Sequence, residues 1–344
     1  MIFFCIEFLL FFKMAKSQSR ILVTGATGFI GSNLVRSLYD NNNKIAIFSQ
    51  DFYHSFLKGL KLKRIKGDIR DYDSVLKAVK GCDYVYHLAA CSLNSVKDKE
   101  KIFSVNVLGT ENVMKACLEA NVKKVVHVSS CSTLGFLKNE KIKLNESNFL
   151  DFEDHIYGQS KKLGEDIVQK YIAKGLKATI VVPAYVVGAG EIDPNRFVVF
   201  KSIAKGRIKF TYPGGIGTVA VEDLVDGIIL AMEKGTDGER YILSNENVKL
   251  FDSYNLIASI LKKPRIKIKL PRISYYPMYL IGFFAQNIMK NPPLTTETVR
   301  WSYNFRYYDS TKAKKELGWK PKIRLKESFR RAINYYKKIG ILEK

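Results

Sequence analysis

The stretch "RILVTGATGFIGSNLV", residues 20–35, decides the fold. An apolar run as long as a buried strand, residues 20–24, leads into three glycines at intervals of three and then into an apolar helical pattern. Glycine permits a tight turn and a close backbone approach, and a helix N-terminus offers free N–H groups to a diphosphate. The stretch therefore predicts a strand, a turn and a helix that bind a dinucleotide. The expected contacts are Gly25, Thr27, Gly28, Phe29, Ile30 and Gly31.

The G-x-x-G-x-x-G spacing differs from the standard G-x-G-x-x-G fingerprint, so a glycine turn without a ligand is the alternative. Downstream, apolar runs alternate with amphipathic stretches. Short Val- and Ile-rich runs separated by helices are typical of a parallel sheet covered on both faces. With right-handed crossovers this gives an α/β fold, a doubly wound parallel sheet of the Rossmann type. The strand candidates are 20–25, 44–49, 62–68, 82–90, 123–130 and 177–184, and the helix candidates are 29–39, 72–80, 99–120 and 157–174.

The alternation breaks down after Pro183, and the segments that follow are loop-rich and aromatic. Within them, residues 218–235 have the pattern of a strand and a helix that rejoin the core. The sequence thus predicts two parts, a nucleotide-binding domain and a smaller C-terminal substrate lobe. The domain comprises 15–184 and 218–245, and the lobe comprises 185–217 and 246–344.

Residues 1–14 contain an apolar run, "MIFFCIEFLLFF", which is shorter than the ~20 residues that cross a bilayer. An over-extended start, with Met14 as the true beginning, and a short membrane-surface anchor both remain open.

The chain has 344 residues and a formal net charge of +23. Its basic residues are spread along the sequence, so we expect no nucleic-acid binding, and weak attraction to anionic cofactors or membranes as a by-product. The five cysteines form no CxxC pair and the four histidines lack ligand spacing. We therefore expect no metal and a cytoplasmic location, with membrane association left open.

Tyr157 and Lys161 lie four residues apart, which places both side chains on one face of a helix. Alone, this spacing is a weak signal, because an ordinary solvent-exposed helix surface gives the same pattern. Together with the glycine turn, however, it makes the chain resemble the extended short-chain dehydrogenase/reductases of the NAD-dependent epimerase/dehydratase superfamily. The resemblance runs from about residue 20 to the C-terminus. Its other matches are "GDIRD" (67–71), "HLAA" (87–90), "NVLGTENVM" (106–114), "VSSCSTLG" (128–135) and "DSTKAKKELGWKP" (309–321).

The resemblance implies a set of site residues. The catalytic ones would be Asn106, Ser130, Tyr157 and Lys161. The cofactor, NAD or NADP, would contact the glycine turn, Ser49, Asp68, Ile69, Leu88, Ala89, Ala90, Tyr157, Lys161 and Pro183, with Asp68 facing the adenine. The second strand ends with Ser49 and is followed by Asp51 and Lys58, which leaves the choice between NAD and NADP open.

The expected chemistry follows from these residue types. A free tyrosine has a pKa of ~10, too high for a good base near neutrality. An adjacent Lys161 and a positively charged nicotinamide should lower the pKa of Tyr157, which would then exchange a proton with an alcohol or carbonyl as hydride moves. Ser130 would hold the substrate oxygen, and Lys161 would also bind the nicotinamide ribose.

Two positions bear on the substrate. Nucleotide-sugar epimerases of this superfamily clamp the substrate diphosphate with an asparagine and an arginine, where this chain has Tyr185 and Ile216, and Ala220 replaces a nearby histidine. The chain instead resembles the dihydroflavonol-reductase-like branch, which includes proteins labelled hopanoid-associated sugar epimerase. We therefore predict an oxidoreductase that interconverts a carbonyl and a hydroxyl on an apolar or lipid-like small molecule.

Two other classes of function stay open. A nucleotide-sugar epimerase or dehydratase would need replacement phosphate contacts, for which Arg300 and Arg306 are candidates. A non-catalytic dinucleotide sensor should have lost the tyrosine or the lysine, and both are present. The aromatic stretch 273–289 suits an apolar substrate, a peripheral membrane contact or the core of the lobe. A homodimer is a further open possibility.

Overall fold

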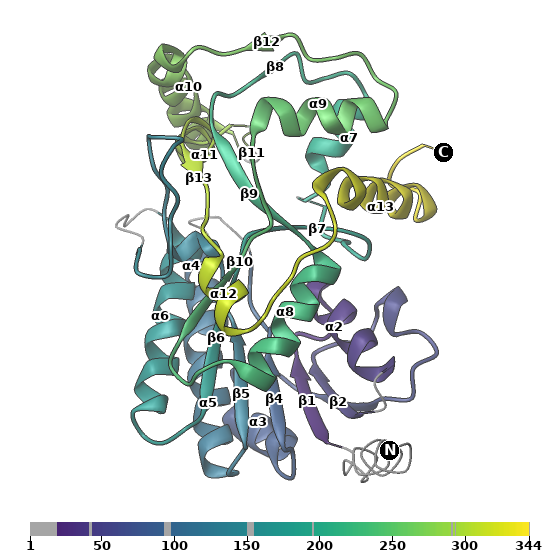
Figure 1. Ribbon diagram of the computed structural model, residues 1–344, viewed down its shortest axis with the longest axis vertical. Helices are drawn as coiled ribbons and strands as arrows, with labels where there is room; N and C mark the ends of the chain where they lie inside the picture. The colour runs from purple at the N-terminus through teal and green to yellow at the C-terminus, as the bar shows by residue number, and fades with distance from the viewer. Residues whose placement is uncertain are drawn as a thin grey trace, which may run out of the picture.

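The computed structural model describes residues 19–40, 43–92, 98–149, 155–194, 196–289, 292 and 294–343, so the apolar run at 1–14 lies outside the described residues. Its centre is a parallel sheet of seven strands in the order β10-β6-β5-β4-β1-β2-β3 (Figure 1). The strands are β1 (Arg20–Thr24), β2 (Lys44–Ser49), β3 (Lys63–Lys66), β4 (Tyr84–His87), β5 (Lys124–Val128), β6 (Ala178–Pro183) and β10 (Arg240–Leu243). The six predicted strands and the doubly wound fold are confirmed; β10 was not predicted.

Helices cover both faces of this sheet. On one face lie α3 (Tyr72–Val79), α5 (Gly109–Glu119) and α6 (Ile156–Ile172); on the other lie α2 (Phe29–Asp40) and α8 (Val221–Lys234). The inner strands are apolar on successive residues because both of their faces are buried: Leu22, Val85, Val125 and Ile180 are all fully inaccessible. This arrangement leaves the carboxyl ends of the strands free to form a site.

A second, smaller sheet follows β6. Its central strand β9 (Gly215–Ala220) pairs antiparallel with β11 (Glu246–Lys249) and parallel with both β7 (Tyr185–Val187) and β13 (Phe305–Arg306). The stretch 218–235 was expected to return a strand and a helix to the core. Its helix, α8, does pack on the main sheet, but its strand is part of β9. The main-sheet position beside β6 is taken by β10 instead.

The lobe has its own apolar core, formed where α7 (Val198–Ala204), α9 (Leu250–Ile260) and α13 (Leu325–Lys338) meet. The C-terminal segment then returns to the main domain through α12 (Thr311–Glu316). The indole of Trp319 is buried and donates to the Asp223 carbonyl of α8 at 2.8 Å. The smaller elements are η1 (Ser55–Leu57), α4 (Lys99–Phe103), η3 (Ser104–Leu108), η4 (Cys131–Thr133), β8 (Phe210–Thr211), β12 (Ile268–Lys269) and η5 (Arg272–Ser274).

The aromatic stretch 273–289 forms α10 (Tyr275–Ile288), which packs against α11 (Thr296–Tyr303) at one end of the molecule, at the top of Figure 1. Packing in the lobe core was one expectation for this stretch. The structure supports it for one face, where Tyr275, Met278 and Tyr279 pack against a small core of Leu294, Val299 and Tyr303. Gly282 is the one buried residue within α10. Among the described residues, no helix combines the length and apolar character that crossing a membrane requires.

Candidate active site

The predicted cofactor residues converge on one edge of the main sheet. The glycine turn follows β1, Ser49 ends β2, Asp68 and Ile69 follow β3, Leu88 to Ala90 follow β4, and Pro183 ends β6. Ser130 follows β5 at the same edge. Ligands of doubly wound folds bind outside the carboxyl ends of the strands, so the topology brings the predicted set to a single site.

The glycine turn has the shape that a dinucleotide requires. Gly25 has φ +69°, and a Cβ there would lie 2.6 Å from the backbone nitrogen of Ala89. A Cβ at Gly31 would lie 2.1 Å from the carbonyl oxygen of Gly25. At Gly28, by contrast, the nearest atom would be that same oxygen at 3.3 Å, so its other side is open. The open side of Gly28, next to the N-terminus of α2, fits a cofactor diphosphate.

Side-chain hydrogen bonds hold the region that is expected to bind the adenosine. The hydroxyls of Ser49 and Thr27 lie 3.0 Å apart, which ties the end of β2 to the glycine turn. The Asp68 carboxylate, which stays the predicted adenine contact, accepts from Arg70 Nε at 3.0 Å and from Gln50 Nε2 at 2.6 Å. The hydrogen bond from Arg70 is the main reason that the pKa of Asp68 is lowered. An adenine would therefore have to share this carboxylate.

Tyr157 and Ser130 are brought together. Tyr157 lies in the first turn of α6, and its phenol shares a hydrogen bond with the Ser130 hydroxyl. The oxygen of Ser130 accepts from the Ser132 backbone N–H at 3.1 Å. Burial raises the pKa of Tyr157, while the nearby Arg196 and the bond to Ser130 act in the opposite direction. The pair has the geometry of a proton donor and an oxygen-binding partner.

Lys161 lies one helical turn further on and is 2% exposed. Its Nζ donates to the Val128 carbonyl at 2.8 Å, and burial lowers the pKa of Lys161 from 10.5 to about 8, opposed by the carboxylate of Glu165. We expected Lys161 to lower the pKa of Tyr157. In the structure the ammonium is turned toward the end of β5, and the cation whose charge acts to lower the pKa of Tyr157 is Arg196. The effect of Lys161 on Tyr157 stays a prediction.

Asn106 lies in the π-helical turn Ser104–Leu108 and is 1% exposed. Its side-chain oxygen accepts from the Cys91 N–H at 2.7 Å, and its Nδ2 donates to the Cys91 carbonyl at 3.0 Å and to Ser160 Oγ at 2.9 Å. These bonds join the segment after β4 to the catalytic helix α6. In this geometry Asn106 positions the site rather than contacting Tyr157 or Lys161.

The sequence prediction missed Arg196. Its Nε lies 3.2 Å from Glu191 Oε2, and burial raises the pKa of that carboxyl. Arg196 also borders a small cavity together with Phe29 of the glycine turn and Tyr185. Both residues of the pair lie in the irregular segment after β7, where no spacing rule marks them. In the sequence, an acid and an arginine five residues apart were the only signal.

Two further contacts that were not predicted fix α6. Glu165 forms a buried ion pair with Arg240 of β10, with Oε2 to Nε at 2.9 Å. His155 accepts from the Gly158 N–H at 2.7 Å and so caps the helix, and its other ring nitrogen lies 3.1 Å from Glu297 of α11. The tyrosine-bearing end of α6 is thereby held against the lobe.

The lobe places an arginine beside the two positions that replace the diphosphate clamp. Arg306 of β13 pairs in register with Ile216 of β9, and its charge acts on Tyr185. Its guanidinium lies 4.9 Å from the centre of the Trp301 ring, and burial lowers the pKa of Arg306. The other candidate, Arg300, lies on α11, where its carbonyl accepts from Asn304 at 2.7 Å. A cation is therefore available near Tyr185 and Ile216.

Comparison with known proteins settles the family. The model of the NAD dependent epimerase/dehydratase family matches residues 21–244. The chain belongs to this family. It is thus an NAD(P)-dependent enzyme of the short-chain dehydrogenase/reductase type that acts on CH–OH groups, and the recognition made from the sequence is confirmed. Among the described residues, no group of histidine, cysteine and carboxylate side chains is arranged to hold a metal ion.

Several relatives of this epimerase/dehydratase family member match over nearly the whole chain. "Sterol demethylase protein B" of Methylococcus capsulatus is 31% identical, over 93% of this chain and 99% of that protein. A putative dihydroflavonol 4-reductase of Synechocystis is 28% identical, over 93% and 95%. A 3 beta-hydroxysteroid dehydrogenase/Delta 5-->4-isomerase of Mycobacterium tuberculosis is 28% identical, over 94% and 92%. The crystal structure of gox2253 superimposes with a TM-score of 0.82 at 31% identity, over 95% of this chain and 100% of that chain.

Proposed function

We propose that this protein is an oxidoreductase that interconverts a hydroxyl and a carbonyl on a sterol-like, apolar substrate, with Tyr157 as the proton-exchanging group. The observation that carries the proposal is the hydrogen bond between Tyr157 and Ser130 at the carboxyl end of β5. It lies on the same sheet edge as the open face of Gly28. A phenol, a hydroxyl and a dinucleotide cradle on one edge suit hydride transfer coupled to proton transfer.

The nicotinamide, when bound, supplies or accepts the hydride. The chain supplies the proton chemistry. Because burial raises the pKa of Tyr157, its phenol is protonated near neutral pH, which is the state that donates a proton to a carbonyl oxygen. Ser130 is placed to hold that oxygen. Arg196 favours the phenolate, so it assists the reverse reaction, in which Tyr157 accepts a proton from an alcohol.

The substrate class rests on the residues of the lobe and on the relatives. Tyr185 and Ile216 stand where a nucleotide-sugar enzyme would have polar phosphate contacts, and burying a diphosphate without paired donors costs several kcal/mol. An apolar substrate meets no such penalty. Two relatives carry sterol or steroid names, which supports the same class.

The second candidate is a nucleotide-sugar epimerase or dehydratase. Arg306 favours it, because Arg306 pairs in register with Ile216 and its charge acts on Tyr185. One arginine would replace part of a clamp that otherwise combines an asparagine and an arginine.

A substrate screen distinguishes the two candidates. Purified protein is incubated with NAD+ or NADP+ and a panel of 3-hydroxysterols and other apolar alcohols. The reverse reaction is tested with the reduced cofactors and the matching ketones. A UDP-sugar serves as the comparison substrate. We expect net oxidation or reduction of the nicotinamide with at least one apolar substrate. Conversion of the UDP-sugar with no net change in the nicotinamide, and no turnover of any apolar compound, would overturn the proposal.

A further inference from the structure

Helix α10 presents an apolar surface to solvent. It has no charged residue, and it packs on α11 through one face, where a Cβ at Gly282 would lie 2.9 Å from the backbone of Thr295. The side chains on its other face are large, apolar and exposed, with Tyr276 at 68% and Phe284 at 58%. We call this the α10 surface; it comprises Ile273, Tyr276, Leu280, Ile281, Phe283, Phe284, Ile288 and Met289. An exposed apolar patch of this kind marks an interaction site.

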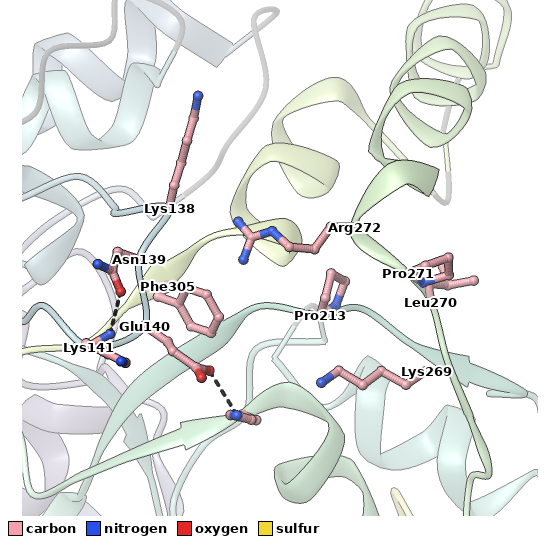
Figure 2. Close-up of a pocket in the computed structure, with 11 residues that line it drawn as sticks. Lys138, Asn139, Glu140, Lys141, Pro213, Lys269, Leu270, Pro271, Arg272 and Phe305 are labelled. Atoms are coloured by element: carbon pink, nitrogen blue, oxygen red, sulfur yellow. Dashed lines mark hydrogen bonds and ion pairs between the residues drawn. The ribbon is translucent and has the colours of Figure 1, made fainter.

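A basic pocket adjoins the α10 surface. It has a volume of about 740 Å³ and lies between the loop 138–141, the segment 269–272 that leads into α10, Pro213 and Phe305 (Figure 2). Five of its lining residues are basic and one, Glu140, is acidic; Glu140 is paired with Lys249 at 2.9 Å. In Figure 2 Lys269 reaches into the pocket, and the Arg272 guanidinium lies 5.5 Å from the Phe305 ring centre.

We propose that the α10 surface and this basic pocket together form a docking surface for an anionic lipid bilayer, with the apolar side chains of α10 in the interface and the pocket at the level of the headgroups. Arg272 joins the two parts, since it lines the pocket and directly precedes Ile273 of the α10 surface. The edge strands β8 and β12 continue the surface with exposed Phe210 and Ile268. An apolar helix face bordered by lysine and arginine is the pattern of a segment that lies in a membrane interface.

Charge complementarity favours a bilayer over a second copy of the chain. A self-complementary contact would bring two basic pockets with the same excess of positive charge close together, in a chain that already carries +23. An anionic membrane satisfies both the apolar face and the positive charge. The docking surface also borders α11, which contacts the tyrosine-bearing end of α6 through Glu297 and His155. Membrane docking does not depend on the proposed function, because it can be measured without substrate.

The first test locates the contact. Phe284→Trp and, as a control, Tyr53→Trp are made in the full-length chain; Tyr53 is 89% exposed and lies on the main domain. Each variant is mixed with vesicles of phosphatidylcholine and phosphatidylserine that contain brominated lipid. The native Trp301 and Trp319 are buried and common to both variants. We expect the lipid to quench the fluorescence of the tryptophan introduced on α10, so that only the Phe284→Trp variant loses signal beyond the wild-type background. Equal quenching in the two variants would overturn the proposal.

The second test addresses the pocket. Lys269→Ala combined with Arg272→Ala should weaken sedimentation with phosphatidylserine vesicles by about tenfold or more, the effect of two basic residues at an anionic surface. The matched control, Lys314→Ala with Lys315→Ala, removes the same charge from exposed positions of α12 and should have a small effect. An equal loss in the two double variants would mean that net charge alone drives binding, against the proposal.

A third measurement examines the alternative occupant. If sedimentation velocity shows a dimer that Leu280→Glu converts to a monomer, and wild-type protein does not bind vesicles, the α10 surface is a dimer interface and the proposal is wrong. Because Leu280 is exposed, this variant should keep the unfolding midpoint of the wild type. A monomer whose vesicle binding is lost with Leu280→Glu would support the proposal. The failure of hydroxysterol turnover would bear on the proposed function and leave these results unchanged.

Discussion

Replacing Lys161 by methionine should make the protein more stable and inactive. In the folded protein burial lowers the pKa of Lys161 from 10.5 to about 8. At pH values between these two pKa values the unfolded chain binds more protons than the folded protein. Burying the charged lysine therefore lowers the free energy of unfolding. This cost is fully present below about pH 8 and fades as the pH approaches 10.5. At 1.36 kcal/mol per pKa unit the cost at neutral pH is about 3 kcal/mol.

The methionine variant loses the hydrogen bond to the Val128 carbonyl, which offsets about 1 kcal/mol of this gain. We therefore expect Lys161→Met to raise the free energy of unfolding by about 2 kcal/mol near neutral pH. At about pH 9.5 the remaining cost of the charged lysine is about 1.4 kcal/mol, so the advantage of the variant should shrink to near zero. Oxidation or reduction of the nicotinamide cofactor should be lost at both pH values, because Lys161 is a predicted cofactor ligand.

Urea unfolding monitored by circular dichroism at the two pH values measures this prediction. The control is Lys162→Met, which removes a half-buried neighbour whose partner is Asp166 one turn away. An ion pair of that kind is worth about 0.5 kcal/mol, and its loss should not have the same pH dependence. A Lys161→Met variant that is less stable than the wild type at neutral pH, or an advantage that does not change with pH, would refute the reasoning.

Four further variants test other parts of the structure. Tyr157→Phe should lower turnover at least ~10²-fold, as loss of a general acid or base implies, while NADH affinity measured by fluorescence stays the same; an unchanged rate would contradict the assignment. Gly28→Ala should weaken NADH binding about tenfold or more and leave the unfolding midpoint unchanged. Gly31→Ala, whose Cβ would lie 2.1 Å from the Gly25 carbonyl oxygen, should lower the free energy of urea unfolding by about 2 kcal/mol or more. A destabilised Gly28→Ala variant beside a Gly31→Ala variant of wild-type stability would contradict the geometry. Arg306→Met should leave turnover of an apolar substrate within a few-fold of the wild type; a total loss would contradict the expectation that such a substrate does not need this arginine.

Local sequence patterns were sufficient for the main sheet and for the glycine turn. Each strand-to-helix unit of the first domain is encoded by an apolar run and an amphipathic run that adjoin in sequence, and Gly25, Gly28 and Gly31 form their turn within seven residues. The proximity of Ser130 to Tyr157 came from the resemblance to the family, since no local rule relates a residue that follows β5 to a residue of α6.

Contacts between distant segments could not be predicted in the same way. Glu165 and Arg240 form a buried ion pair although they are far apart in sequence, and the strand β9 has the apolar pattern of a main-sheet strand but pairs elsewhere. The cation beside Tyr157 is Arg196, from an irregular segment without periodicity. Apolar character also does not separate a buried helix from an exposed one, and for that reason the exposure of α10 emerged only from the structure.

The fate of the transferred hydride tests the central claim most directly. The 3-hydroxysterols and other apolar alcohols of the panel are labelled with deuterium on the carbon that bears the hydroxyl, and each is incubated with the protein and oxidised cofactor. The account predicts that deuterium accumulates in the released reduced nicotinamide, and that Tyr157→Phe abolishes this transfer. It would be contradicted if a UDP-sugar labelled in the same way were converted with its deuterium retained in the sugar product, no labelled nicotinamide were released, and no apolar alcohol transferred its label.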